Sequence, residues 1–168
     1  MPGQPAASER AGQFQLLLKD EGGCGGMLIE YNGKKPRVSE KAFVAPGATL
    51  IGDVEVGEEA SIWFGARLRG DIGKITVGAR TSIQDNVVVH VFGGGRTDIG
   101  EDVTVAHGAV LHNCTVHRGA LIGMNAVVLD NAVIGEQAVG DEGPLAAYLI
   151  SFRHRNEYRK DGAGRLLH

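Results

Sequence analysis

The chain has 168 residues, of which 43% are hydrophobic but only 5% aromatic, and it carries 26 glycines against 5 prolines. This length suits one domain, and the composition favours many short strands joined by tight turns over a helical globule or a disordered chain. The net charge of −3 excludes the basic footprint of a nucleic-acid-binding protein.

The rest of the composition points to the cytoplasm. The apolar runs are too short to cross a bilayer, and the chain does not start with the apolar core and basic flank of a signal peptide. Two cysteines, Cys24 and Cys114, are too few for a disulfide framework. We therefore expect a soluble cytoplasmic protein with no membrane partner and no nucleic-acid partner.

The chain divides into three segments. Residues 1–26 begin small and polar and end in the run GGCGG, which predicts a flexible extension in which Cys24 has no role. Apolar runs then flank Asn32-Gly33, a pair typical of tight two-residue turns. Residues 27–139 form the expected folded domain, and residues 140–168 form a tail of different character.

The folded domain carries an internal repeat with a period of about six residues. This period excludes an amphipathic helix, and an ordinary meander of hairpins would not hold it for so long. Two insertions and one short step interrupt the repeat without changing the order of the steps. Fifteen aliphatic positions, three to a triangular coil, predict five coils, and a small or apolar residue stands four places after most of them. The aliphatic positions are Val44, Leu50, Val56, Ile62, Leu68, Val77, Ile83, Val89, Ile99, Val105, Leu111, Val116, Ile122, Val128 and Ile134; the small or apolar positions include Ala48, Ala60, Ala109 and Thr115.

Three histidines follow this register in a way that suggests a metal site. His90 and His112 directly follow interior positions that are three steps apart, so both side chains point outward and stack at about 4.8 Å, the spacing of adjacent strands. Two imidazoles at that separation can share one metal ion. His107 belongs to the preceding face, near a corner, and we expect a neighbouring copy of the chain to supply it. Three imidazoles with an open fourth position are the ligand set of a catalytic zinc ion.

The same register places three further polar residues. Arg69 lies one coil before His90, while Gln84 and Asp85 lie one coil before Ala106 and His107. Between facing subunits Arg69 would meet Asp85, and opposite charges there would fix the register of the contact. Gln84 would lie close enough to hydrogen-bond a metal-bound water or the substrate.

The repeat resembles that of a known fold family. Segments such as IGDVEVGEEASI and LIGMNAVVLDNAVIG resemble hexapeptide-repeat proteins, which implies an all-β, left-handed parallel β-helix. In that fold the aliphatic residue fills the interior of a triangular prism and the small residue fits its corner. Each coil buries its interior residues against its neighbours, so stability accumulates along the stack.

The segments that contain the histidines resemble one family of hexapeptide-repeat proteins in particular. LRGDIGKITVGARTSIQDNVVVH and DIGEDVTVAHGAVLHNCTV resemble the γ-class carbonic anhydrases. The resemblance implies a homotrimer in which His90, His107 and His112 bind zinc, with iron or cobalt as alternatives, between subunits. It also implies functional roles for Arg69, Gln84 and Asp85. The implied reaction is the reversible hydration of carbon dioxide to bicarbonate by a metal-bound hydroxide, since zinc lowers the pKa of its water to about 7.

The chain departs from the archetypal members of that family at three places. Ile72 stands where they carry a glutamate, and residues 91–95 contain no carboxylate where they have an acidic loop. Those acids help to move protons. The tail at 140–168 does not match the family. It predicts either a short C-terminal helix over residues 144–160, with proline in the first turn, that would cover the open end of the coil, or a poorly packed replacement tail. His154 and His168 are expected to be solvated.

Two other functions stay open at this point. The first is a hexapeptide-repeat acyltransferase that uses acetyl-CoA, and the second is a non-catalytic metal-binding or assembly homologue, which the missing acids favour. Fold alone does not choose among them. We further expect His117 to be a surface residue and Cys114 to be a small interior side chain.

Overall fold

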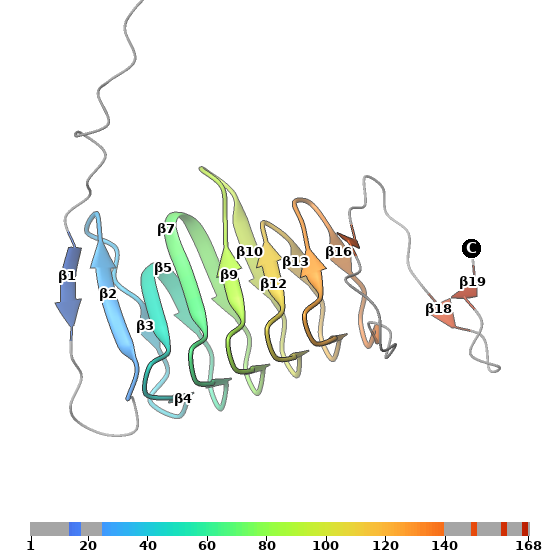
Figure 1. Ribbon diagram of the computed structural model, residues 1–168, viewed down its shortest axis with the longest axis horizontal. Helices are drawn as coiled ribbons and strands as arrows, with labels where there is room; N and C mark the ends of the chain where they lie inside the picture. Colours follow the sequence, from blue (N-terminus) through green and yellow to red (C-terminus); the bar gives the residue numbers. More distant parts are fainter. Residues whose placement is uncertain (1–13, 18–24, 140–148, 151–158, 161–165, 168) are drawn as a thin grey trace, which may run out of the picture.

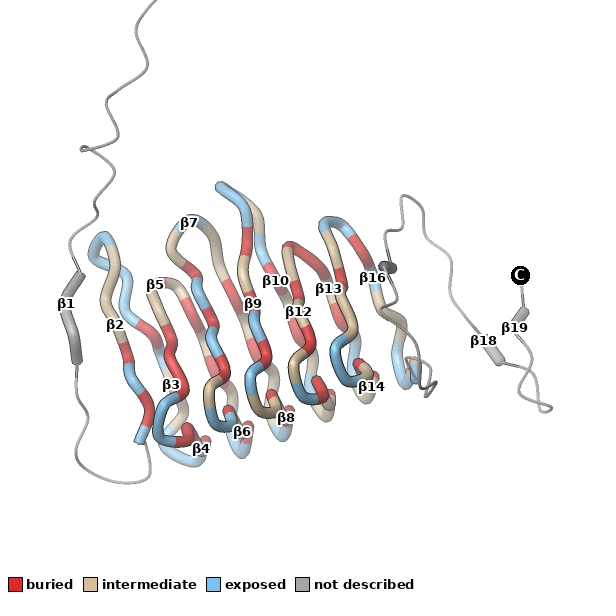
Figure 2. Tube along the Cα trace, viewed as in Figure 1, coloured by how far each residue is buried: buried red, intermediate tan, exposed pale blue. Residues whose placement is uncertain are grey.

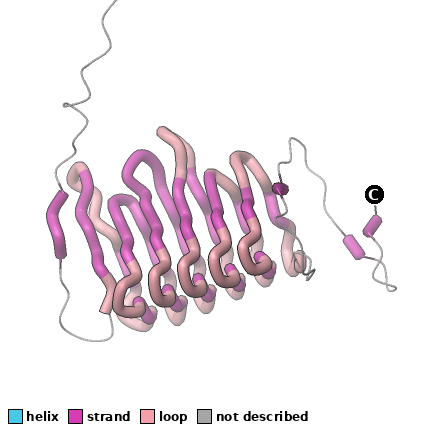
Figure 3. The backbone as a smooth tube through the Cα atoms, in the orientation of Figure 1, coloured by secondary structure: helices cyan, strands magenta, loops and turns pink. Residues whose placement is uncertain are grey.

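The computed structural model describes residues 14–17, 25–139, 149–150, 159–160 and 166–167. Within those ranges the chain consists of strands, turns and loops and contains no helix (Figure 3). Short strands stack in successive coils along the long axis of the molecule, as Figure 1 shows. The predicted all-β, parallel β-helix of hexapeptide repeats is confirmed, with parallel pairing between each coil and the next.

Three walls build the coil. Wall A and wall C belong to one sheet, because two long strands, β5 and β7, pass round the corner between them; wall B is a separate sheet. Wall A consists of β2 (Met27–Tyr31), the start of β5 (Thr49–Val56), the start of β7 (Arg67–Val77), β9 (Val88–His90), β12 (Val110–His112) and β15 (Val127–Val128). Wall B consists of β4 (Phe43–Val44), β6 (Ser61–Ile62), β8 (Ser82–Ile83), β11 (Thr104–Val105) and β14 (Leu121–Ile122). Wall C consists of β3 (Arg37–Val38), the ends of β5 and β7, β10 (Arg96–Ile99), β13 (Thr115–Val116) and β16 (Val133–Ile134).

The register predicted from the six-residue period is confirmed in each wall. Leu68 pairs with Val89 in wall A, and Val89 pairs in turn with Leu111. Equivalent rows run from Val44 to Ile122 in wall B and from Val56 to Ile134 in wall C. Leu28 and Val38 extend walls A and C by one position before the predicted repeat begins.

The aliphatic rows form the core of the prism. Buried positions recur at matching places in successive coils (Figure 2), and every predicted interior residue except Ile134 is buried. Most of the expected corner residues are also buried. Thr115 is a correction: it lies in β13 and is partly exposed, while Cys114 takes the interior place. The reason is that the step from Leu111 to Val116 is one residue short.

Two insertions leave the coil at the same corner, between walls A and C. Residues 70–74, which belong to β7, and the loop at 91–95 stack on each other, since the backbone N–H of Gly94 donates to the carbonyl of Ile72 at 3.0 Å and that of Lys74 donates to Gly95 at 3.3 Å. A Cβ on Gly73 would lie 2.4 Å from the carbonyl oxygen of Gly95. Glycine is therefore required at position 73, where the two inserted segments meet.

The expected turn at Asn32-Gly33 is present, but it does not build a full hairpin. Both residues have positive φ, 49° and 73°, and Tyr31 and Lys34 exchange backbone hydrogen bonds at 2.9 and 3.0 Å. The strand that follows, β3, pairs with β5 rather than with β2. The turn therefore leads the chain from wall A to wall C of the first coil.

The ends of the chain add a few short strands. Within the predicted extension, β1 (Phe14–Leu17) pairs antiparallel with β2. In the tail, β17 (Leu149–Ile150) pairs parallel with β15, and β18 (Arg159–Lys160) pairs with β19 (Leu166–Leu167). Most of the predicted helix at 144–160 lies outside the described residues; the four residues of it that are described are in strands. His154 and His168 also lie outside them, and the three-segment division stays a prediction.

None of the described residues forms a helix with the length and apolar character that a bilayer crossing requires.

We expect the interior row of wall A to contribute strongly to stability. Leu111 is fully buried between its partners in β9 and β15, so Leu111→Ala should lower the free energy of unfolding by about 2–5 kcal/mol through lost burial and a residual cavity. Denaturant titration followed by circular dichroism measures the loss. Val133→Ala is the matched control, because this strand residue is 53% exposed and should change stability by less than about 0.5 kcal/mol. Equal losses for the two variants would contradict the assignment of the core.

Candidate metal centre

The predicted stacking of two histidines on wall A is confirmed. His112 pairs with His90 in the parallel register of β9 and β12, and their ring centroids are 5.2 Å apart at an interplanar angle of 49°. Because each follows a buried residue in its strand, both imidazoles point outward. One face of a single chain therefore presents two imidazoles side by side.

A carboxylate and an arginine lie beside His90. Arg69 occupies the place one coil before His90, as predicted, and it forms an ion pair with Asp71. The other oxygen of Asp71 lies 3.0 Å from Nε2 of His90. Partial burial acts to raise the pKa of Asp71, but the hydrogen bonds from Arg69 and His90 outweigh it and hold that pKa below its ordinary value. Burial lowers the pKa of His90 despite this contact, which favours the neutral imidazole that a metal ion requires.

His112 has a carboxylate partner of its own. Nδ1 of His112 is hydrogen-bonded to the carboxylate of Asp130, which lies in the turn after β15 in the next coil. A carboxylate on one ring nitrogen leaves the other nitrogen available, which is the usual arrangement of a metal-ligating histidine. The sequence reasoning missed Asp130. The available signal was its position, two residues after the wall A residue Val128, which itself pairs with Leu111.

His107 lies at the corner between walls B and A. Nδ1 of His107 lies 3.0 Å from Asp85, so the prediction that Asp85 lies next to His107 in the preceding coil is confirmed. Backbone hydrogen bonds link this corner from coil to coil: Asn86 donates to the carbonyl of Phe64, and Gly108 donates to that of Asp85, at 3.0 and 2.9 Å. The His107 side chain is 55% exposed and faces solvent in a single chain.

A single chain does not bring all the predicted ligands together. Among the described residues, no group of three His, Cys, Asp or Glu side chains is arranged to hold a metal ion. Gln84 follows Ile83 on wall B, where its backbone N–H donates to Val105 at 2.9 Å. Arg69 and Asp85 each have a partner within the chain, so their pairing across a subunit contact stays a prediction.

The donor set nevertheless fits zinc in its chemistry. Three imidazoles with carboxylate partners match the ligands and the hydrogen-bonded surroundings that zinc prefers. His107 and His112 have their carboxylates on Nδ1, whereas Asp71 contacts Nε2 of His90. Ligation through that nitrogen of His90 would require the Asp71 carboxylate to move away.

Apolar residues flank the histidine pair at the corner between walls A and C. Ile72 is 47% exposed and Phe92 is 44% exposed; Ile72 lies in the inserted part of β7, and Phe92 lies in the loop at 91–95 that stacks on it. Ile72 directly follows Asp71, the partner of His90. The side of the pair at which archetypal γ-class members carry acids is therefore apolar in this chain.

An aromatic cluster covers wall B and its corner with wall A. We define it as Phe43, Trp63 and Phe64, whose neighbouring ring centroids lie 5.3 and 6.4 Å apart. Nε1 of Trp63 donates to the hydroxyls of Ser61 and Ser82, each at 3.1 Å, which ties the indole to the strands of wall B. All three rings remain exposed to solvent.

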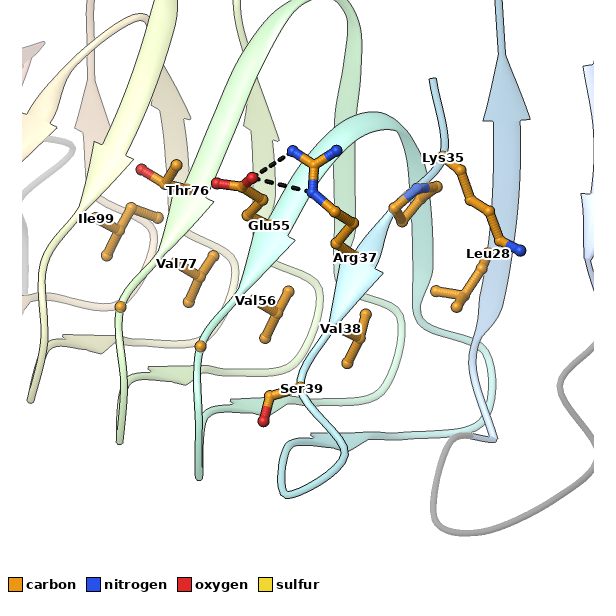
Figure 4. Close-up of a pocket in the computed structure, with 13 residues that line it drawn as sticks. Leu28, Lys35, Arg37, Val38, Ser39, Glu55, Val56, Thr76, Val77 and Ile99 are labelled. Carbon is orange, nitrogen blue, oxygen red and sulfur yellow. Dashed lines mark hydrogen bonds and ion pairs between the residues drawn. The ribbon is translucent and has the colours of Figure 1, made fainter. Parts of the chain in front are cut away.

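A pocket lies along wall C, and Figure 4 shows the residues that line it, none of which is a histidine. Its apolar lining takes one side chain from each of several coils, among them Val56, Val77 and Ile99. On its rim Arg37 donates to Glu55 through Nε at 3.0 Å. None of the predicted site residues lines this pocket, and we assign it no part in the metal centre.

Curated proteins that are similar to this chain include carbonic anhydrases. The chain is 48% identical over 124 residues to "Gamma carbonic anhydrase 2, mitochondrial" of Arabidopsis thaliana, covering 70% of the chain and 45% of that protein. It is 44% identical over 110 residues to the "Carbonic anhydrase" of Geobacillus kaustophilus, covering 66% of the chain and 60% of that protein. The chain thus spans about half the length of these curated relatives.

A solved structure is similar as well. The "hexapeptide transferase family protein" from Anaplasma phagocytophilum matches with a TM-score of 0.59 and 42% identity, covering 67% of this chain and 73% of that one. No protein-family model matches the chain.

We expect Cys114 to be chemically inert in the folded protein. Burial raises its pKa to about 12, so at pH 8 almost none of it is the thiolate that reacts. Peptide mapping after iodoacetamide treatment should find Cys114 unmodified in the native protein and fully alkylated in guanidinium chloride. Rapid alkylation of the native protein would contradict the interior position of Cys114.

Proposed function

Because this chain belongs to the γ-class carbonic anhydrase-like family of hexapeptide-repeat proteins, we propose that it catalyses the reversible hydration of carbon dioxide. The observation that carries this proposal is the outward-facing pair His90–His112, whose ring centroids are 5.2 Å apart on adjacent coils. A zinc ion held there would lower the pKa of water to about 7 and so supply a nucleophile near neutral pH.

The third ligand, His107, comes from a neighbouring copy. In one chain the pair lies on wall A, whereas His107 lies at the corner between walls B and A with its side chain 55% exposed. A three-fold assembly that sets this corner of one copy against wall A of the next would complete one site at each contact. The active form is therefore a homotrimer, with iron and cobalt as alternative metals.

Exposed apolar side chains support contact at that corner. Matching positions of successive coils at this corner are occupied by Phe64, Asp85 and His107. Trp63 packs beside Phe64. Met124, 67% exposed, follows His107 in the next coil; the backbone of the neighbouring Asn125 donates to the carbonyl of His107. Apolar and aromatic residues that flank a polar ligand are typical of the core of a protein interface.

The chain's own residues have distinct roles in this proposal. Asp85, whose carboxylate lies 3.0 Å from Nδ1 of His107, orients that ring. Arg69 holds Asp71 next to His90 and adds positive charge where bicarbonate would form. Gln84, one coil before Ala106, donates a hydrogen bond to a substrate oxygen. The apolar pair Ile72 and Phe92 excludes water from one side of the site.

An acyltransferase that uses acetyl-CoA is the second candidate. It is favoured by the similarity to the Anaplasma hexapeptide transferase family protein. That reaction needs a histidine in a cleft between subunits but no set of three ligands. Cleavage of the acetyl-CoA thioester in the presence of a panel of amine and hydroxyl acceptors, without dependence on bound metal, would favour it over hydration.

A metal-binding assembly protein without catalysis is the third candidate. Full zinc occupancy with no hydration of carbon dioxide above background would favour this role, which fits the apolar residues at the positions of the archetypal acids.

A cytoplasmic location also stays a prediction.

We expect subunit mixing to reveal a shared site. His107→Ala and His112→Ala should each abolish zinc binding and carbon dioxide hydration. Coexpression of the two variants in equal amounts should restore about a quarter of the wild-type sites. At each contact, the subunit that supplies the His90–His112 pair is the His107→Ala chain about half of the time. The neighbouring subunit, which supplies His107, is the His112→Ala chain in about half of those contacts. Zinc content and stopped-flow hydration rates measure the recovery.

The control for mixing is each variant expressed alone, which should still assemble. If the coexpressed chains form mixed trimers but bind no zinc, the site does not lie between chains. If the wild-type protein itself binds no zinc after gentle purification, the proposed metal-dependent function is wrong.

We expect a charge in the aromatic cluster to break the assembly. Phe64→Lys should weaken each subunit contact by about 2 kcal/mol or more, because a central aromatic residue of an interface is replaced by a charge. Light scattering over a range of concentrations should then find monomers, and zinc binding should be lost with them. Val133→Lys, an equally exposed position on wall C, should leave the trimer intact. An unchanged mass for Phe64→Lys would place the contact elsewhere.

A further inference from the structure

We propose that Asp130 is a positioning residue that holds His112 in the tautomer and orientation required for metal binding. The inference rests on the proposed metal-dependent function and adds to it a residue outside the expected ligand set. Its basis is the hydrogen bond between Nδ1 of His112 and the Asp130 carboxylate.

The backbone fixes Asp130 beside the histidine. Asp130 lies in the turn after β15, and the next residue, Asn131, has a positive φ of 63°. The backbone N–H of Asn131 donates to the carbonyl of Asn113 at 2.8 Å, and Asn113 directly follows His112. The turn that carries the carboxylate is therefore hydrogen-bonded to the residue next to the imidazole it contacts.

Asp130 differs from the other carboxylate at the pair. Asp71 is shared between Arg69 and His90, and it contacts Nε2 of that ring. Among the described residues, His112 is the sole hydrogen-bond and ion-pair partner of Asp130. The contact is on Nδ1, so it places the proton there and leaves the Nε2 lone pair free for a metal ion.

A structural role alone does not account for this pair. The Asp130 side chain is 47% exposed and that of His112 is 29% exposed, and exposed ion pairs contribute little to folding. His107 shows the same pattern, with Asp85 3.0 Å from its Nδ1. Two of the three expected ligands thus have a carboxylate on the same ring nitrogen.

The test compares zinc affinity in the full chain. The dissociation constant of zinc, measured by competition with a chromophoric chelator, should rise by about 10- to 100-fold in Asp130→Ala. Asp130→Asn should give a smaller increase, because the amide oxygen still accepts from Nδ1–H but carries no charge. Asp130→Glu should recover part of the affinity. Glu136→Ala is the matched control, because Glu136 is exposed and has no hydrogen-bond or ion-pair partner in the described part of the chain.

A second measurement separates positioning from stability. Nitrogen NMR of the zinc-free protein should find the proton of neutral His112 on Nδ1 in the wild type and distributed over both nitrogens in Asp130→Ala. The thermal midpoint should stay the same in both proteins. If Asp130→Ala does not fold, Asp130→Asn decides by the same two measurements.

The possible results distinguish the role of Asp130 from the existence of the metal centre. Suppose that the wild type binds zinc and that His112→Ala does not. If Asp130→Ala then keeps the wild-type zinc affinity and the wild-type His112 tautomer, the role of Asp130 alone is overturned. Zinc affinity equal in the wild type and His112→Ala would overturn the proposed metal centre itself.

Discussion

The parallel register between one coil and the next is the constraint on which every other feature depends. Strands in a wall pair at about 4.8 Å, so residues at matching positions of successive coils are direct neighbours. That spacing packs Leu68, Val89 and Leu111 into one interior row. The same spacing places His90 and His112 side by side on the outside of the wall. Core and candidate site are thus two faces of one row of strands.

The fold was predictable because the sequence repeats it. Aliphatic residues at intervals of six determine which side chains fill the prism, and the insertions after Leu68 and Val89 do not disturb the pairing on either side of them. The outward stacking of two histidines followed from the same register. Thr115 shows the limit of predicting positions from the period. The step from Leu111 to Val116 is one residue shorter than the period, so Cys114 rather than Thr115 lies in the interior. Counting from Leu111 does not show at which position the step is shortened.

The carboxylates around the histidines were harder to predict, for a physical reason. Outward positions within strands alternate regularly, but Asp71 and Asp130 lie in the corners, where side-chain direction depends on local φ and ψ. Asn131, for example, has a φ of 63°, which no period in the sequence specifies. Sequence reasoning therefore located the imidazoles but not the partners of His90 and His112. Asp85 was placed correctly next to His107 because it falls at the same register position one coil earlier.

The stacking of the two inserted loops at one corner has a consequence for how such chains diversify. Residues 70–74 and 91–95 leave the prism together, and the strands on either side keep their register, so these loops can change in length or composition at little cost to the core. They also flank the histidine pair, with Ile72 and Phe92 at their exposed surface. Selection can therefore alter the polarity of the site entrance while the scaffold stays fixed. Related chains that share this prism could therefore acquire different chemistries by changing only these two inserted segments.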